Sequence, residues 1–321
     1  MRPRASRRTS TACWTRTSSE GECAGFRFGA RRLNPGVRRI LQISDVHFGP
    51  HHLPELSAAV IDLIAERRPD FVAISGDMTL RAKPHQFQEA RAWVDRFDTP
   101  SLAVPGNHDV PLYRVFERAL FPHSAYRKHF DRELEPTFQD DELHVVGVNT
   151  AFNWTFTEGR IKLGQLKDIE ERISAAGDRV KIVVAHHPLI PPPWSGSQRV
   201  LRNAPEAIET LSRAGVELVF SGHRHVSYIG NSELHFPSGS PPLLVVCCGT
   251  TTSARGRSAE KGRNSCNWVE VDDRRIVVTN LWWELAEKRF VERTRHSFPR
   301  RHARPYQLEE GSVPESTPTS P

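Results

Sequence analysis

Short apolar runs alternate with amphipathic stretches through the middle of this chain. The runs predict strands at residues 40–44, 71–74, 101–104, 143–148, 180–185 and 216–220. The stretches between them carry apolar residues at helical spacing and predict helices over 53–67, 86–97, 113–130, 163–175 and 204–214. Later strand signals follow one another without helices, at 243–248, 268–271 and 275–282. This order favours an α/β (α+β) fold with mixed sheets covered by helices.

Five of the predicted strands end in polar side chains that bind metals. These side chains are Asp45 with His47, Asp77, Asn107 with His108, His186, and His223 with His225. Asp45 and His47 are two residues apart, so they project to the same side of an extended chain. Because open α/β sheets place their sites at the carboxyl ends of strands, we expect these side chains to meet.

The residue types at these strand ends predict a site for two cations. Histidine nitrogens and carboxylate or amide oxygens suit manganese, iron, zinc or cobalt, with the identity left open. Two ions about 3.5–4 Å apart need an anionic bridge, and Asp77 is the natural one. Two divalent cations with Asp45, Asp77 and a bridging hydroxide leave one net positive charge. Such a site attracts a phosphodiester anion.

The net charge of +6 over 321 residues belongs to the ends of the chain. Residues 1–39 hold ten arginines and two glutamates, so the remainder is near −2. This distribution favours solvated tails over a nucleic-acid-binding surface. We therefore expect a basic disordered extension over 1–36, one domain over 37–290, and a basic, then Ser/Pro/Thr-rich disordered tail over 291–321. Val37 is also a candidate start, because valine is a common misreading of an alternative start codon.

The five cysteines contain no Cys-x-x-Cys pair, so a thiolate zinc site is not expected. Cys247 and Cys248 lie within an apolar, strand-like run. This position predicts reduced, packed thiols and a cytoplasmic protein. The sequence has no apolar run long enough to span a bilayer.

Five blocks of sequence follow the order found in the calcineurin-like metallophosphoesterases, and residues 40–285 resemble that superfamily. The blocks are Asp45-x-His47, Gly76-Asp77, Gly106-Asn107-His108-Asp109, His186-His187-Pro188 and Gly222-His223-x-His225. Residues 75–82, 104–111 and 249–255 are similar to the bacterial branch that contains the cyclic-AMP phosphodiesterases (class III). The resemblance implies a four-layer αββα sandwich of two mixed sheets. It also implies a first metal on Asp45, His47, Asp77 and His225 and a second on Asp77, Asn107, His186 and His223.

The expected activity is hydrolysis of a small phosphodiester, a cyclic nucleotide or glycerophosphodiester, by a metal-bridging hydroxide. By resemblance, His108 faces the leaving-group oxygen and supplies a proton or a hydrogen bond. Asp109 would orient that ring through its other nitrogen. His187 is expected to point away from the ligands and to act on the substrate side. Arg255, Arg257 and Asn264 are candidates for binding phosphate or a base, with a solvated loop equally open.

Three alternatives remain open: a catalytically silent metal-binding scaffold, a nucleotide-lipid pyrophosphohydrolase, or a nuclease of the same superfamily. Met78-Thr79-Leu80 and Pro105 stand where the Ser/Thr phosphatase branch carries other residues, which counts against a protein phosphatase. Basic residues lie at the tails rather than around the site, so nucleic acid is not the expected partner. The oligomeric state is left open, with a homodimer among the alternatives.

Overall fold

The structure is a computed structural model that describes residues 36–155, 157–194, 200–237 and 239–301. These residues belong to one compact unit that begins at Gly36. The predictions of a disordered extension before Gly36 and of a disordered tail over 302–321 concern residues outside the described set.

Two six-stranded mixed sheets form the middle of the described unit. The first, in the order β12-β11-β10-β1-β2-β3, consists of β1 (Arg38–Ile43), β2 (Phe71–Ile74), β3 (Ser101–Ala103), β10 (Ser265–Val271), β11 (Arg275–Glu284) and β12 (Arg289–Pro299). The second, in the order β4-β5-β6-β7-β9-β8, consists of β4 (Thr137–Gln139), β5 (Leu143–Gly147), β6 (Val180–Val184), β7 (Leu218–Ser221), β8 (Tyr228–Asn231) and β9 (Leu244–Cys247). Strands β1, β2 and β3 are parallel, as are β5, β6, β7 and β9. The carboxyl ends of each parallel set therefore lie at one edge of its sheet.

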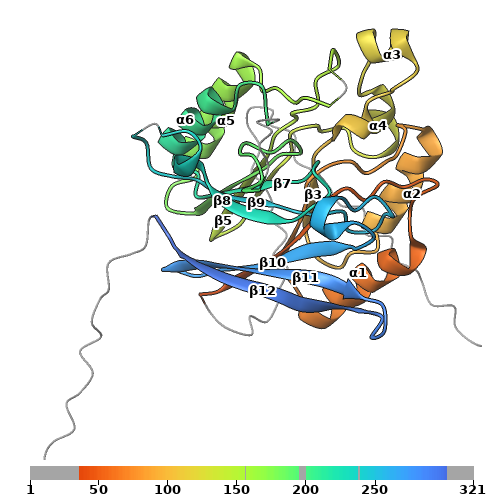
Figure 1. Ribbon diagram of the computed structural model, residues 1–321. Coiled ribbons are helices and arrows are strands. Elements are labelled where there is room, and N and C mark those ends of the chain that lie inside the picture. Colours follow the sequence, from red (N-terminus) through yellow and green to blue (C-terminus); the bar gives the residue numbers. More distant parts are fainter. Residues whose placement is uncertain (1–35, 156, 195–199, 238, 302–321) are drawn as a thin grey trace, which may run out of the picture. The chain divides into compact units, whose positions relative to one another are not determined.

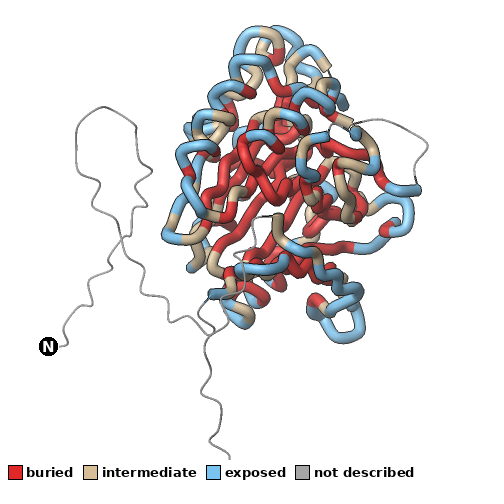
Figure 2. Tube along the Cα trace, turned by 90° about the vertical axis from the view of Figure 1, so that its left-hand side faces the viewer, coloured by how far each residue is buried: buried red, intermediate tan, exposed pale blue. Residues whose placement is uncertain are grey.

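The two sheets pack face to face, and helices cover their outer faces (Figure 1). Ile40, Phe71 and Leu102 of the first sheet share a buried cluster with Val145 and Phe220 of the second. Helices α1 (Pro54–Arg67), α2 (Pro84–Val94) and α4 (Ser124–His129) pack on the first sheet, and α5 (Leu163–Ser174) and α6 (Ala204–Ala214) pack on the second. Figure 2 shows the buried strands inside and exposed positions on the outer helices. The four-layer αββα sandwich is thus confirmed.

The segment 113–130 was predicted as one helix, and this prediction is wrong. It forms two short helices, α3 (Val115–Leu120) and α4. The break is at Phe121, which has φ −139° and ψ 53°. Phe121 precedes Pro122, and a proline ring disfavours the helical conformation in the residue before it.

The predicted tail from residue 291 is also wrong for residues 291–299, which lie within β12. This strand pairs antiparallel with β11, and Phe290 near its start packs into the core. The rest of β12 is mostly exposed and carries the charged residues Glu292, Arg293 and Arg295, as suits an edge strand. These charged residues are the reason why the sequence predicted a disordered tail here. The short edge strands β4 and β8 have no counterpart among the predicted strands.

Three cysteines fall in the described residues: Cys247, Cys248 and Cys266. All three are buried and free, as the packed-thiol prediction requires. Cys13 and Cys23 lie outside the described set. Within that set, every helix is too short or too polar to cross a bilayer.

Candidate metal centre

The turns after the parallel strands hold their polar residues in a left-handed backbone conformation. Asp45, His47, Asp77, His223 and His225 have φ between 51° and 70°. This conformation costs a residue with a side chain roughly 1–3 kcal/mol and persists where surrounding contacts enforce it. Here the backbone N–H of Asp45 donates to Gly76 O (3.1 Å) and that of His47 donates to Asp77 O (2.9 Å). The strained turns direct the side chains into one place.

Asp45 and Asp77 each use one carboxylate oxygen in hydrogen bonds and leave the other bare. Asp45 Oδ2 accepts from Ser44 Oγ (2.7 Å) and from the backbone N–H of His223 (2.9 Å). Asp77 Oδ1 accepts from the backbone N–H of His108 (2.8 Å). Asp45 Oδ1 and Asp77 Oδ2 are buried and have no hydrogen-bond partner. Since an unpartnered buried carboxylate oxygen is costly, these two atoms fit the role of cation ligands.

Backbone carbonyls fix the tautomers of three histidines in the cluster. The Nδ1 atoms lie near carbonyl oxygens in the pairs His47–Thr79 (3.4 Å), His186–Ser75 (2.8 Å) and His225–Arg255 (2.8 Å). A carbonyl can only accept, so the Nδ1 of each ring is the donor in this contact and Nε2 is the atom placed to bind a cation. The Nε2 atoms of His47 and His225 are 3.3 Å apart, and His225 Nε2 is 3.2 Å from Asp45 Oδ1. Converging lone pairs of this kind suit a bound cation.

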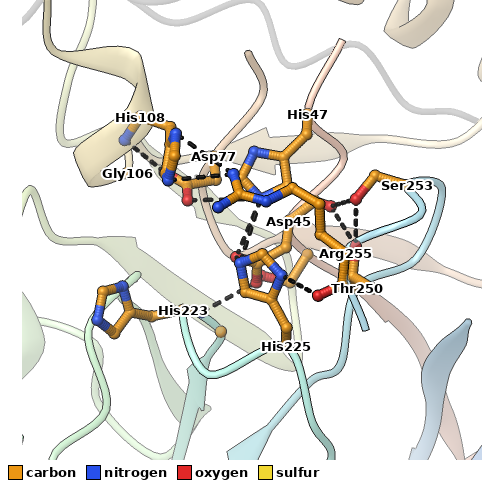
Figure 3. Close-up of polar contacts among 12 residues, drawn as sticks. Asp45, His47, Asp77, Gly106, His108, His223, His225, Thr250, Ser253 and Arg255 are labelled. Carbon is orange, nitrogen blue, oxygen red and sulfur yellow. Dashed lines mark hydrogen bonds and ion pairs between the residues drawn. The ribbon is translucent and has the colours of Figure 1, made fainter. Parts of the chain in front are cut away.

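All seven predicted metal ligands lie in two adjoining groups. The ligand atoms of Asp45, His47, Asp77 and His225 lie within 4.8 Å of one another, and Figure 3 shows these side chains converging. In the second group, Asn107 Oδ1 is 3.1 Å from His186 Nε2 and 2.9 Å from His223 Nδ1. His186 Nε2 is also 3.4 Å from Asp77 Oδ2, so Asp77 lies between the groups.

Burial and neighbouring charges set the protonation of the cluster. Burial, then the charges of Asp45 and Asp109, raises the pKa of Asp77 well above its usual value. Burial acts in the same direction on Asp45, but His225 and His47 hold the pKa of Asp45 well below its usual value. Burial lowers the pKa of His47, whose neutral ring can then bind a cation. A cation would also compensate the two neighbouring carboxylates.

Two glycines allow the close approach that the carboxylates need. A Cβ atom on Gly106 would collide with Asp77 Oδ1 and with the Asp77 backbone. A Cβ atom on Gly222 would collide with Ser44 Oγ beside Asp45. These positions explain why glycine occurs in the two blocks.

His108 lies beside the first group and contacts Arg255. Its Nδ1 donates to Leu80 O (2.9 Å), and its Nε2 is 3.2 Å from Arg255 Nη1 (Figure 3). Burial and the Arg255 charge lower the pKa of His108 to about 3. The ring is therefore neutral at neutral pH and accepts a hydrogen bond from the guanidinium group.

Asp109 does not orient His108, so that prediction is wrong. Its carboxylate accepts from the backbone N–H groups of Met78 (3.1 Å), Thr79 (2.8 Å) and Gly106 (3.0 Å), and from Thr79 Oγ1 (2.9 Å). The Nδ1 of His108 binds a carbonyl instead. Asp109 connects the turn after β3 to the turn after β2.

His187 was predicted to point away from the ligands, and this prediction is wrong. Its ring centroid is 4.6 Å from that of His223 and 4.9 Å from that of His186. Its Nδ1 is 2.8 Å from Thr150 Oγ1, and its Nε2 is buried without a partner. The ligand nitrogens of the three histidines lie within 4.8 Å of one another, so the second group includes His187.

Asn264 was predicted to contact substrate, and the structure contradicts this role. The side chain is buried, and its amide donates to Ser253 O (2.8 Å) and to Thr250 O (3.4 Å). Asn264 holds the 250–253 loop, whose Thr250 hydroxyl in turn donates to Asp45 O (2.7 Å).

A cavity of about 110 Å³ opens over the cluster. Its walls include Asp77, Asn107, His108, His187, His223 and Arg257. Thr157 and Glu158 also line it, and sequence reasoning missed both, because no motif marks their segment. Arg257, a candidate from the sequence together with Arg255, lies in the loop after β9 and lines the cavity.

The profile of the calcineurin-like phosphoesterase family matches residues 38–227. The chain is 25% identical over 224 residues to the "Probable cyclic nucleotide phosphodiesterase syc0937_d" of Synechococcus, covering 67% of this chain and 83% of that protein. It is 24% identical over 201 residues to the glycerophosphodiester phosphodiesterase GpdQ of Enterobacter lignolyticus, covering 58% and 70%. Among solved structures, the purple acid phosphatase PPD1 of yellow lupin superposes with a TM-score of 0.62 at 12% identity, covering 82% of this chain and 53% of that one. This last likeness concerns the fold alone.

Proposed function

The chain belongs to the calcineurin-like phosphoesterase family, and from this premise we propose that it hydrolyses a small phosphodiester at a dinuclear metal centre. The proposed first cation is held by Asp45, His47, Asp77 and His225. The proposed second cation is held by Asp77, Asn107, His186 and His223. The names of two relatives, a cyclic nucleotide and a glycerophosphodiester phosphodiesterase, support a small diester as the substrate class.

One observation carries the proposal: two buried carboxylate oxygens without partners lie near the Nε2 atoms of histidines whose Nδ1 atoms contact backbone carbonyls. Asp45 Oδ1 and Asp77 Oδ2 lack hydrogen bonds, whereas the other oxygen of each carboxylate is bound. Cations held here would lower the pKa of a shared water and offset charge on the phosphoryl group. A site without cations would leave this arrangement uncompensated.

We assign His108 and Arg255 to the leaving-group side of the substrate. Arg255 can donate to a phosphoryl oxygen while its Nη1 lies against His108 Nε2. The Leu80 carbonyl holds the ring by Nδ1, so Nε2 faces the leaving oxygen. The negative charge of a bound diester opposes the effect of Arg255 and favours protonation of His108 at Nε2. His187, with its unpartnered Nε2 on the cavity wall, is assigned to the substrate or to the second cation.

The proposal also covers the identity of the metals and the cellular location of the protein. The mixed nitrogen and oxygen ligands suit manganese or iron, with zinc and cobalt as alternatives. The free, buried thiols of Cys247, Cys248 and Cys266 support a cytoplasmic location.

The activity is tested by supplying the manganese-loaded protein with bis(p-nitrophenyl) phosphate, p-nitrophenyl phosphate, cyclic AMP and glycerophosphodiesters. We expect diesters to be hydrolysed faster than the monoester, and Asp77→Asn to abolish both hydrolysis and full metal loading. Absence of hydrolysis with both sites filled would favour the metal-binding scaffold instead.

The proposed roles of His108 and Arg255 in catalysis are tested with the variants His108→Ala and Arg255→Ala. Each should keep both metals and lower kcat by roughly 10²-fold or more. Arg263→Ala is the matched control, because Arg263 is exposed on the same loop. Unchanged turnover in metal-replete His108→Ala would remove His108 from the reaction.

A further inference from the structure

An exposed apolar surface surrounds helix α3. We define the α3 surface by Tyr113, Val115, Phe116, Leu120, Phe121 and Trp154, each between 65% and 86% exposed. Ten large apolar side chains stand out as exposed in the described part of the chain, and these are six of them. Concentration of this kind marks an interaction surface, since single exposed apolar residues normally scatter.

The α3 surface is held together by buried polar contacts. The guanidinium group of Arg118 on α3 is largely buried and donates to Pro111 O (3.0 Å), Asn153 O (2.7 Å) and Thr155 O. The side chain of Asn153 donates back to Ala119 O (3.2 Å). These bonds fix Trp154 beside the helix, so the surface is a built feature of the fold.

The α3 surface lies close in sequence and in contacts to the proposed active site. Arg114 Nη2 donates to Ala82 O (2.7 Å), two residues from the Leu80 carbonyl that holds His108. The segment that carries Trp154 continues into Thr157, which lines the cavity. Figure 1 shows α3 projecting beyond α4, away from both sheets.

Positive charge accompanies the apolar side chains. Arg114 is exposed just before α3 and pairs with Glu117 (3.0 Å), and Arg127 and Lys128 are exposed on α4. Arg81 adds a further cation, 5.7 Å from the ring centre of Tyr113. Aromatic and aliphatic side chains next to lysines and arginines are the composition of surfaces that bind anionic lipid.

We propose that the α3 surface docks the protein on an anionic lipid bilayer, with α3 inserted at the headgroup level. A symmetric pair of chains joined through this surface would bring two copies of the same basic residues into one interface, which disfavours a second copy as the occupant. Docking would bring the cavity close to the membrane surface. This proposal does not depend on hydrolysis, because binding to lipid can be measured without substrate.

The test is sedimentation of the full chain with vesicles at 0.15 M salt, which screens charges separated by more than about 8 Å. One set of vesicles is phosphatidylcholine alone, and the other includes phosphatidylglycerol. We expect the wild type to sediment with the anionic vesicles, and Phe116→Ser/Leu120→Ser to bind them roughly tenfold or more weakly. The matched control is Leu234→Ser/Leu285→Ser, which removes two equally exposed leucines elsewhere and should bind like the wild type.

Three outcomes would overturn the proposal: a wild type that stays in solution with anionic vesicles, a Phe116→Ser/Leu120→Ser variant that binds like the wild type, or a wild-type dimer in light scattering that this variant converts to monomer. Thermal melting confirms that each variant is folded. All three proteins should hydrolyse a soluble diester at the same rate. A chain that binds vesicles but hydrolyses nothing would refute the phosphodiesterase proposal and leave the docking surface intact.

Discussion

Gly106 occupies a position where the site has no room for a side chain. Its missing Cβ would collide with the Asp77 carboxylate, which lies between the two ligand groups. A displaced Asp77 would misplace ligands for both cations at once, and small misplacements of reacting groups carry large kinetic costs.

We therefore predict that Gly106→Ala lowers kcat/KM by roughly 10²-fold or more and reduces metal content. Gly164→Ala is the control, because a Cβ there meets open space. Steady-state kinetics and elemental analysis check both variants. Equal activity of Gly106→Ala and wild type would show that Asp77 can shift without consequence.

His123 provides a pH prediction outside the metal cluster. Burial, then the charge of Arg127, lowers the pKa of His123 to about 4, from a usual value of 6.5. As pH falls, the unfolded chain takes up this proton first, so the stability contribution is full above pH 6.5 and is lost between 6.5 and 4.

Replacing the ring by His123→Gln should make the fall in unfolding free energy over this window shallower, by up to about 1.4 kcal/mol per pH unit. Denaturant unfolding at several pH values measures the slope. Parallel curves for variant and wild type would mean that His123 does not titrate differently in the two states.

That the seven proposed ligands gather in one place could be predicted from the sequence, because each follows a recognisable apolar run. The groups that the Asp109 side chain contacts could not be predicted from the sequence. Its partners Met78 and Thr79 are some 30 residues away, and the sequence does not reveal which turns meet in the folded chain. His187 was misjudged similarly: the ideal alternation of a strand does not continue into the turn that follows β6.

At the scale of elements, Asp109 joins the turns after β2 and β3. Its buried carboxylate receives four hydrogen bonds from these turns. Removing it would leave three backbone N–H groups without their acceptor in a buried place. Removal of the Asp109 carboxylate should therefore lower the stability of the fold as well as the activity.

We predict that Asp109→Ala lowers the free energy of unfolding by about 3 kcal/mol. Asp141→Ala, at an exposed acid between β4 and β5, should change it little. Denaturant unfolding distinguishes the two. An Asp109→Ala protein as stable as the wild type would show that these four hydrogen bonds make no net contribution to stability.

Most elements could be predicted from periodicity, but those at the edges could not. The central strands carry continuous apolar runs because both of their faces are buried. Edge strand β12 is mostly polar and exposed, and its pairing with β11 is what makes it a strand. The division of 113–130 depends on the single proline at position 122, which a pattern of apolar positions does not register.

At the scale of the molecule, the proposed centre joins the two sheets. Asp45, Asp77 and Asn107 follow strands of the first sheet, whereas His186 and His223 follow strands of the second. A cation shared by these ligands would link the sheets at their carboxyl edges. The order of strand and helix signals favoured mixed sheets covered by helices, and the family resemblance implied the four layers. The structure adds which strands form each sheet and which sheet carries each ligand.

Metal removal should therefore destabilise the whole domain. A ligand present at 100 times its Kd stabilises a folded protein by about 2.7 kcal/mol. Treatment with a chelator should lower the Tm by several degrees, and manganese should restore it. An unchanged Tm after complete removal, verified by elemental analysis, would place the metals outside the structural link between the sheets.

The central claim is that two cations share Asp77 between the sheets. Anomalous diffraction from crystals of the manganese-loaded protein tests it most directly. We predict two anomalous peaks about 3.5–4 Å apart, one beside Asp45, His47 and His225 and the other beside Asn107, His186 and His223, with Asp77 bound to both. A fully loaded, folded protein with a single peak, or with peaks away from Asp77, would contradict the account.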